Sequence, residues 1–329
     1  MRVLAAGFAL TCALLPAAAL GQATSTGSGQ AYPSKAVRMV VPFAPGGTSD
    51  IIGRALGTRL SEAWMQPVLM DNRVGVAGSL GAANAAKSPP DGYTLLVGNI
   101  GPVAINNSIY KSTGYDPLKD FTPITLAVTA PQLVVVHPSV PAKTFREFGA
   151  LVKAHRGKIT FGSSGPGSIS HLSGELYKRM TKTDMLHVPF KASAFITTAV
   201  LGGEIDLVFS DMAVVLPHVQ GGRLRALAVT GLKRTPLVPN MPTVAESGLP
   251  GFDMTSWWGV LGPAGLPQPI VTQLNSELAR ILRSPDVQKN FATLGVDATT
   301  STPEEFSALI RSEVAKYAKL IQEIGIEKQ

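Results

Sequence analysis

The sequence has almost no cysteine. Cys12 is the only one among 329 residues, and it lies inside an N-terminal apolar run. A lipid anchor at Cys12 would need a small residue before it, where Thr11 stands. The rest of the chain has no thiol for a disulfide or a thiolate metal site, so its stability must come from packing.

Charged and aromatic residues are also scarce, at 16% and 6%, whereas hydrophobic residues make up 45% of the chain. This composition predicts a globular protein with sizeable cores. The net charge of +7 comes from scattered residues, with no basic run and no recognition motif. We therefore expect no nucleic-acid partner and a preference for small anions.

Long apolar runs are absent after the first 23 residues. Arg2, the Ala/Leu-rich stretch 3–20 and the small-x-small cleavage site at 21–23 predict a secretory signal over 1–23. A membrane anchor is the weaker alternative, because polar and proline residues interrupt the run. Residues 24–31 are typical of a flexible polar leader, and we expect the mature chain in the periplasm.

Short β-branched runs alternate with longer segments of helical period, which is typical of parallel sheets flanked by helices. Two such series occur. The first predicts strands at 37–41, 67–70 and 93–98 with helices at 51–65 and 80–87. The second predicts strands at 133–136, 158–161, 186–188, 205–209 and 225–229, with a helix that begins at the capping box of Thr144 and Glu147.

The number of strands exceeds what one sheet commonly holds. We therefore predict an α/β protein of two lobes, each a mainly parallel sheet flanked by helices, joined by two extended crossings near 124–134 and 252–262. The first lobe comprises 32–130 and 253–329, and it ends in two helices, the last beginning at Thr302. The second lobe comprises 131–252.

One turn between a strand and a helix predicts an anion site. Its candidate ligand-binding residues are Phe43, Ala44, Gly46, Gly47 and Thr48. The glycines allow close backbone approach, and the helix that follows presents N–H groups and its positive dipole end. No lysine or arginine lies between positions 40 and 52, so the turn suits a carboxylate. The alternative is an ordinary turn capped by Thr48, Ser49 or Asp50.

A second turn, 162–168, also follows a strand. Its glycines are spaced G-x-x-G-x-G, unlike a dinucleotide fingerprint, so we expect no cofactor. Its candidate residues are Ser163, Ser164, Gly167, Ser168 and, in the helix beyond, His171, which could instead cap or pack. Both turns follow the carboxyl ends of strands, so we expect them to face each other across a cleft and hold one anion. A purely structural turn remains the alternative.

Further candidates are Asn99, Phe190, Lys191, Ser193 and Asp211. Lys191 offers a positive group, or is an ordinary surface lysine; Asp211 caps a helix unless the ligand carries an amine. The usual nucleophile, phosphate-loop and metal-ligand motifs are missing, so we predict no catalytic or metal residues and no enzyme activity.

Five motifs in order and spacing resemble the Bug-type solute receptors, the exported binding proteins of tripartite tricarboxylate transporters. They are Pro42 to Asp50, Asp71 to Gly78, Lys87 to Leu96, Gly162 to Gly167 and Trp258 to Pro267. The resemblance implies a two-lobed periplasmic binding protein, type II-like and monomeric, that closes on a small organic carboxylate and presents it to a membrane permease. In similar proteins the loops corresponding to 43–50 and 163–168 hold the carboxylate.

One segment departs from the family pattern. Phe190-Lys191-Ala192-Ser193-Ala194-Phe195 stands where the family often has Tyr-Lys-Gly-x-x-Pro. The change favours a less polar ligand, such as an aromatic or longer-chain carboxylate. Two other functions stay open: a periplasmic sensor for a signalling partner, and a hydrolase or isomerase on a similar frame.

Overall fold

The computed structural model describes residues 32–190 and 193–328. The first predicted series of strands and helices is confirmed, with boundaries that move by at most a few residues. It comprises β1 (Val37–Val41), α1 (Thr48–Trp64), β2 (Val68–Asn72), the short helix η1 (Val76–Gly78), α2 (Ser79–Ala86) and β3 (Thr94–Asn99). Two short helices, η2 (Gly101–Ile105) and α3 (Asn106–Ile109), lead to the long strand β4 (Phe121–Val136).

The second series is also confirmed. It comprises α4 (Phe145–Ala154), β5 (Thr160–Ser163), α5 (Ile169–Thr181), β6 (Leu186–Pro189), α6 (Ser193–Leu201), β7 (Leu207–Asp211), α7 (Met212–Gln220) and β8 (Arg225–Val229). The chain returns through β9 (Thr255–Pro263) and ends in α8 (Gln268–Leu282), α9 (Pro285–Thr293), β10 (Asp297–Ala298) and α10 (Pro303–Glu323).

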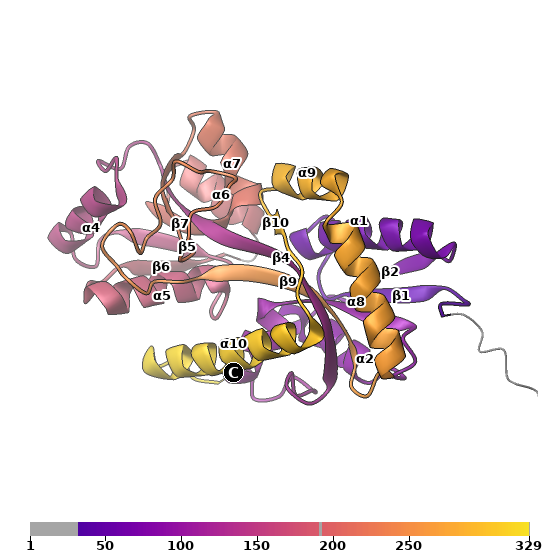
Figure 1. Ribbon diagram of the computed structural model, residues 1–329. Helices are drawn as coiled ribbons and strands as arrows, with labels where there is room; N and C mark the ends of the chain where they lie inside the picture. Colours follow the sequence, from indigo (N-terminus) through magenta and orange to yellow (C-terminus); the bar gives the residue numbers. More distant parts are fainter. Residues whose placement is uncertain (1–31, 191–192, 329) are drawn as a thin grey trace, which may run out of the picture. The chain divides into compact units, whose positions relative to one another are not determined.

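The strands form one hydrogen-bonded sheet and not two separate ones. Its order is β2-β1-β3-β9-β4-β7-β5-β6, with β8 and β10 also paired to β4. The sequence could not show this, because β4 is long enough to pair with β9 over its first part and with β7 over its last. β4 and β9, the two predicted crossings, run side by side (Figure 1).

Pairing is parallel within β1–β3 and among β5–β7, and antiparallel wherever β4 or β9 takes part. The sheet is therefore mixed. The parallel pairs are those joined by helical connections, which parallel pairing requires. The predicted α/β class holds, and the extended crossings account for the antiparallel pairs.

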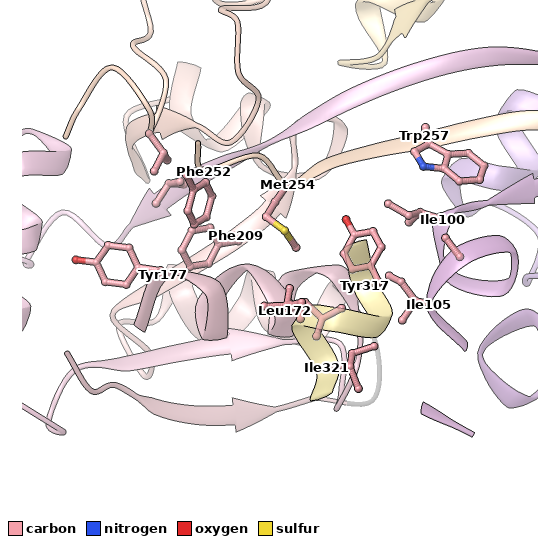
Figure 2. Packing of buried hydrophobic residues seen from close by; sticks show 14 of the residues in the cluster. Ile100, Ile105, Leu172, Tyr177, Phe209, Phe252, Met254, Trp257, Tyr317 and Ile321 are labelled. Atoms are coloured by element: carbon pink, nitrogen blue, oxygen red, sulfur yellow. The ribbon is translucent and has the colours of Figure 1, made fainter. Parts of the chain in front are cut away.

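Helices cover both faces of the sheet. On one face α1, α8 and α9 pack on β1, β3 and β9. On the other face α2, η2 and α10 share a core with α4 and α5. α10 thus contacts elements that precede β4 and elements that follow it (Figures 1 and 2).

The helix starts follow the sequence closely. Thr302 and Glu305 form the complete capping box of α10. At α4, Thr144 accepts from the N–H of Glu147, but the Glu147 carboxylate accepts from Lys143 N–H rather than from Thr144. The predicted start is correct and the reciprocal bond moves by one residue.

Two tyrosine hydroxyls are buried without a hydrogen-bonding partner among the described residues, those of Tyr177 and Tyr317. Tyr317 is fully buried, and Figure 2 shows it within the apolar cluster beneath β9. Burial, together with the charges of Glu313 and Asp253, raises the pKa of Tyr317 far above its usual range. By contrast, the hydroxyl of buried Tyr115 donates to the carbonyl of Pro102 at 2.6 Å.

Tyr317→Phe should therefore leave the free energy of unfolding unchanged or raise it, because an unpaired buried hydroxyl is costly. The matched change Tyr115→Phe should lower it by about 0.5–1.5 kcal/mol. Urea denaturation of both variants checks the difference. Equal losses would show that Tyr317 has a partner.

Candidate ligand-binding site

The register along β4 relates the ends of two strands on which candidate residues lie. Trp258 of β9 pairs with Asn99, the last residue of β3, and with Val128 of β4. Asp211, the last residue of β7, pairs with Gln132 of β4. Through Trp258, Asn99 is level with Val128 of β4, whereas Asp211 pairs directly with Gln132. These two positions of β4 are four residues apart, which is about 13 Å along a strand.

These strand ends point toward each other. β3 runs in the same direction as β4, since each is antiparallel to β9, whereas β7 runs opposite to β4. β1 is parallel to β3, and β5 is parallel to β7. The turn after β1 therefore lies on one side of the gap and the turn after β5 on the other, the arrangement in which open α/β sheets bind ligands.

The first turn presents backbone rather than side-chain caps. The N-cap of α1 is Gly47, with no side-chain cap, so capping by Thr48, Ser49 or Asp50 is not observed. The left-handed glycine is Gly46 (φ 82°), whereas Gly47 is extended (φ −78°). Ala44, Gly46 and Gly47 are exposed, and Phe43 and Thr48 are half-buried.

Asp50 holds this turn from below. Its buried carboxylate accepts from Gly46 N–H, Arg54 Nε and Asn72 Nδ2, each at 2.9 Å. Burial opposes ionisation, but these hydrogen bonds outweigh it and hold the pKa of Asp50 below its usual range. Asn72 Nδ2 also donates to the carbonyl of Phe43 at 3.0 Å. The turn is fixed by buried groups, and its outer N–H groups keep their orientation.

Ser49 links the first turn to the crossing strand. Its hydroxyl accepts from Trp258 Nε1 at 2.9 Å and from Asn99 Nδ2 at 3.4 Å. The side-chain Oδ1 of Asn99 in turn accepts from Gly101 N–H at 3.2 Å. Both ends of the Asn99 side-chain amide thus form hydrogen bonds within the protein, which link it to Ser49 and Gly101.

The second turn uses its serines in different ways. Ser163 is fully buried, and its Oγ accepts from Gly165 N–H and lies 2.5 Å from His187 Nε2. Ser168 caps α5, accepting from His171 N–H. Ser164 is exposed, and only its backbone N–H is engaged, by Ser170 Oγ at 3.2 Å. Ser164 is therefore the serine of this turn whose hydroxyl is available.

Gly167 lies at a close contact. Its φ is 77°, and a Cβ added there would lie 1.9 Å from Cδ1 of Ile109 in α3. The positive φ therefore favours glycine at this position, and a larger residue would in addition force the Ile109 side chain to move. The second turn thus packs directly against a helix that precedes β4.

Two histidines support the second turn from beneath. His171 and His187 stack with ring centroids 4.1 Å apart, and Phe161 lies against both. His171 Nδ1 accepts from Gly167 N–H at 3.0 Å, which requires a neutral ring at that nitrogen. Burial, with His187 and Lys178, lowers the pKa of His171 to about 4. His171 is thus a neutral acceptor that packs within the lobe.

Asp211 stands at the start of α7 but forms no side-chain cap. Burial raises its pKa to about 6, with the Ser256 hydroxyl acting in the opposite direction. The residue as a whole is half-buried, and it lies at the sheet edge that carries the second turn. The sequence interpretation of Asp211 as a helix cap therefore holds for its position at the N-cap of α7 but not for its side chain, which makes no capping hydrogen bond.

The remaining candidates are less central. Phe190 is half-buried and packs on the core of β4, α6 and α7, while Phe195 is 60% exposed. Lys191 lies outside the described residues, and for Ser193 only the backbone, at the start of α6, is described.

Sequence reasoning did not assign the supporting contacts of four residues: Ser49, Asn72, Trp258 and His187. Asn72 and Trp258 lie in motifs that carried the family resemblance, so a signal existed. His187 gave none, because its contact with Ser163 arises from the parallel pairing of β5 with β6.

Two cavities lined by described residues lie elsewhere on the molecule. Within 32–190 and 193–328, no group of three metal-binding side chains occurs. In the same ranges, no helix has both the length and the apolar character needed to cross a membrane.

Comparisons with known proteins all point to one family of receptors. The profile of the tripartite tricarboxylate transporter family receptor matches residues 52–326. A protein encoded between tcbD and tcbE in Pseudomonas sp. strain P51 is 36% identical over 94% of this chain and 93% of its own. BugT of Bordetella pertussis is 33% identical over 91% and 92%.

Solved structures agree. Rpa4515 of R. palustris with adipate has a TM-score of 0.82 and 35% identity, covering 91% of this chain and 100% of its own. The periplasmic binding protein BugD has a TM-score of 0.78 and 33% identity, covering 91% and 100%. MatC of Rhodopseudomonas palustris with bound malate has a TM-score of 0.77 and 31% identity, covering 88% and 100%.

The neutral state of His171 generates a pH prediction. The unfolded chain protonates this histidine near 6.5, whereas the folded protein does so near 4, so folding stability falls as pH drops between these values. His171→Asn keeps an acceptor for Gly167 N–H but cannot titrate. Its free energy of unfolding should therefore fall less than that of the wild type.

Denaturation at pH 7 and 4.5 measures this slope in both proteins. His155→Asn is the control, since His155 is exposed. A His171→Asn slope as steep as the wild-type slope would contradict the account.

Proposed function

The chain belongs to the tripartite tricarboxylate transporter receptor family, and we propose that it is an extracytoplasmic receptor that captures a small organic carboxylate and delivers it to a membrane permease. One observation carries this proposal. Two glycine-rich turns, each followed by a helix start, stand at strand ends that point toward each other across a four-residue stretch of β4.

The chemistry of the two turns supports a carboxylate. The first turn offers backbone N–H groups at the positive end of the dipole of α1. In the second turn the N–H groups of Ser164, Gly165, Gly167 and Ser168 are bonded within the protein, so its donor is the Ser164 hydroxyl. The hydroxyls of Thr48 and Ser164 have no partner among the described side chains and can donate to the anion. The relatives crystallised with adipate and malate hold ligands of this class.

A hydrolase is less well supported, although Ser163 Oγ lies 2.5 Å from His187 Nε2. A catalytic serine must reach its substrate, and Ser163 is fully buried beneath its turn. Its oxygen also accepts from Gly165 N–H. This serine and histidine hold the turn in place, so we favour binding without chemical turnover.

The division into lobes follows the register of β4. Up to Pro131, β4 pairs with β9, and from Gln132 onward it pairs with β7. This change supports lobes of 32–130 with 253–329, and of 131–252. A ligand that contacts both turns stabilises the closed arrangement by its additional contacts there.

Asp211 narrows the ligand class. An ionised carboxyl at this edge repels a second carboxylate, whereas its raised pKa of about 6 lets it take a proton near neutral pH. Asp211 therefore suits a ligand with an amine, or a dicarboxylate with which it shares a proton.

Location and partners complete the proposal. The predicted signal over 1–23 directs the chain to the periplasm, where it acts as a monomer that docks on integral-membrane permease subunits. A sensor with the same ligand site would dock on a signalling protein instead, and a pull-down from membranes that recovers permease subunits distinguishes transport from sensing.

Ligand screening by thermal shift tests the function. Adipate, malate and related acids should raise the melting temperature, and glucose should not, because the turns offer donors and little fixed charge. For the acid that gives the largest shift, Ser164→Ala should raise Kd roughly tenfold to a hundredfold, since a hydrogen bond to a charged group is lost.

Calorimetry measures Kd, and Ser139→Ala serves as the control, because Ser139 is an exposed serine outside the turns. Nuclear magnetic resonance of the recovered ligand shows whether it stays unchanged. A shift with glucose alone, or consumption of the acid, would contradict the proposed function.

A further inference from the structure

A cavity of about 430 Å³ opens beside α3, away from both turns. Its lining comes from α3, from the segment that follows α3, and from a lysine five residues beyond the end of α10: Asn107, Tyr110, Lys111, Ser112, Thr113, Gly114, Tyr115 and Lys328. The lining therefore carries two ammonium groups, the hydroxyls of a serine and a threonine, and two phenols, and it includes no carboxylate.

Hydrogen bonds fix the shape of this cavity. Asn107 Nδ2 donates to the carbonyl of Tyr115 at 3.2 Å, and Thr113 Oγ1 donates to Asn107 Oδ1 at 2.9 Å. Lys328 Nζ donates to the carbonyl of Asn107 at 2.9 Å, which ties the C-terminal segment to the cavity wall. These bonds fix the walls of the cavity and hold the Lys328 ammonium group beside it.

A third cation stands next to it. A Cβ built on Gly114 would lie 3.8 Å from Lys87 Nζ, at the end of α2. Among the described residues, none of Lys87, Lys111 and Lys328 forms an ion pair with a carboxylate. Like charges gathered without counter-charges favour a bound anion, and several ammonium groups favour one with more than one negative charge.

We propose that this cavity is a second anion site that takes a phosphate group, either of a free phosphate or of a lipid headgroup. Lysines bind phosphate as point charges, and the hydroxyls of Ser112 and Tyr110 supply further donors. This chemistry differs from that of the two turns, whose described residues carry no free ammonium group and suit a carboxylate.

The test uses the mature chain and inorganic phosphate. Calorimetry at low ionic strength should show saturable binding of one phosphate. In the double variant Lys111→Gln with Lys328→Gln, Kd for phosphate should rise at least tenfold. The control removes equal charge elsewhere, through Lys233→Gln with Lys289→Gln, and should change Kd less than twofold because both lysines are exposed and line neither the cavity nor the turns.

Flotation with phosphatidylglycerol vesicles separates the two sources. Wild-type protein that floats, with a double variant that does not, assigns the site to a lipid headgroup. Phosphate binding without flotation assigns it to a free anion. Phosphate binding that does not saturate, or that is equal in all three proteins, overturns the proposal, whatever acid the two turns bind.

Discussion

The hydrogen bonds between β4 and its neighbours set the distance between the two ligand-facing turns, because they are the pairs that connect β3 to β7. β4 exchanges partners from β9 to β7 between Pro131 and Gln132. A slip of one residue on either side would move a whole set of side chains to the opposite face of the sheet. The cores on both faces of β4, with residues such as Val128 and Val134 fully buried, oppose such a slip.

In each turn, a buried polar side chain accepts a hydrogen bond from a backbone N–H group and so holds the turn in place. Asp50 does so as an ionised acceptor for Gly46 N–H, and His171 as a neutral acceptor for Gly167 N–H. The two side chains differ in charge. Hydrogen bonds favour the charged form of Asp50, whereas burial favours the uncharged form of His171. In both cases the turn is organised before a ligand arrives, which reduces the entropy lost on binding.

Much of this could be predicted from the sequence. Local signals identify the strand before each turn, the glycines within it and the helix after it, because these depend on short-range periodicity and turn chemistry. The single sheet could not be predicted, since it depends on β4 pairing with strands more than 70 residues away, such as β7. The same limit applies within the site. Periodicity cannot tell that Gly46 rather than Gly47 is left-handed, or that Ser163 is buried against His187 while Ser164 is exposed.

The central claim is that both turns hold one carboxylate together. Amide resonances of residues 46–49 and of Gly165, Gly167 and Ser168, followed in ¹⁵N-labelled protein during titration with adipate, test it most directly. The account predicts that the resonances of both turns shift with a single dissociation constant, while the amide resonances of α9 do not shift. Saturable binding in which only one set moves would contradict it.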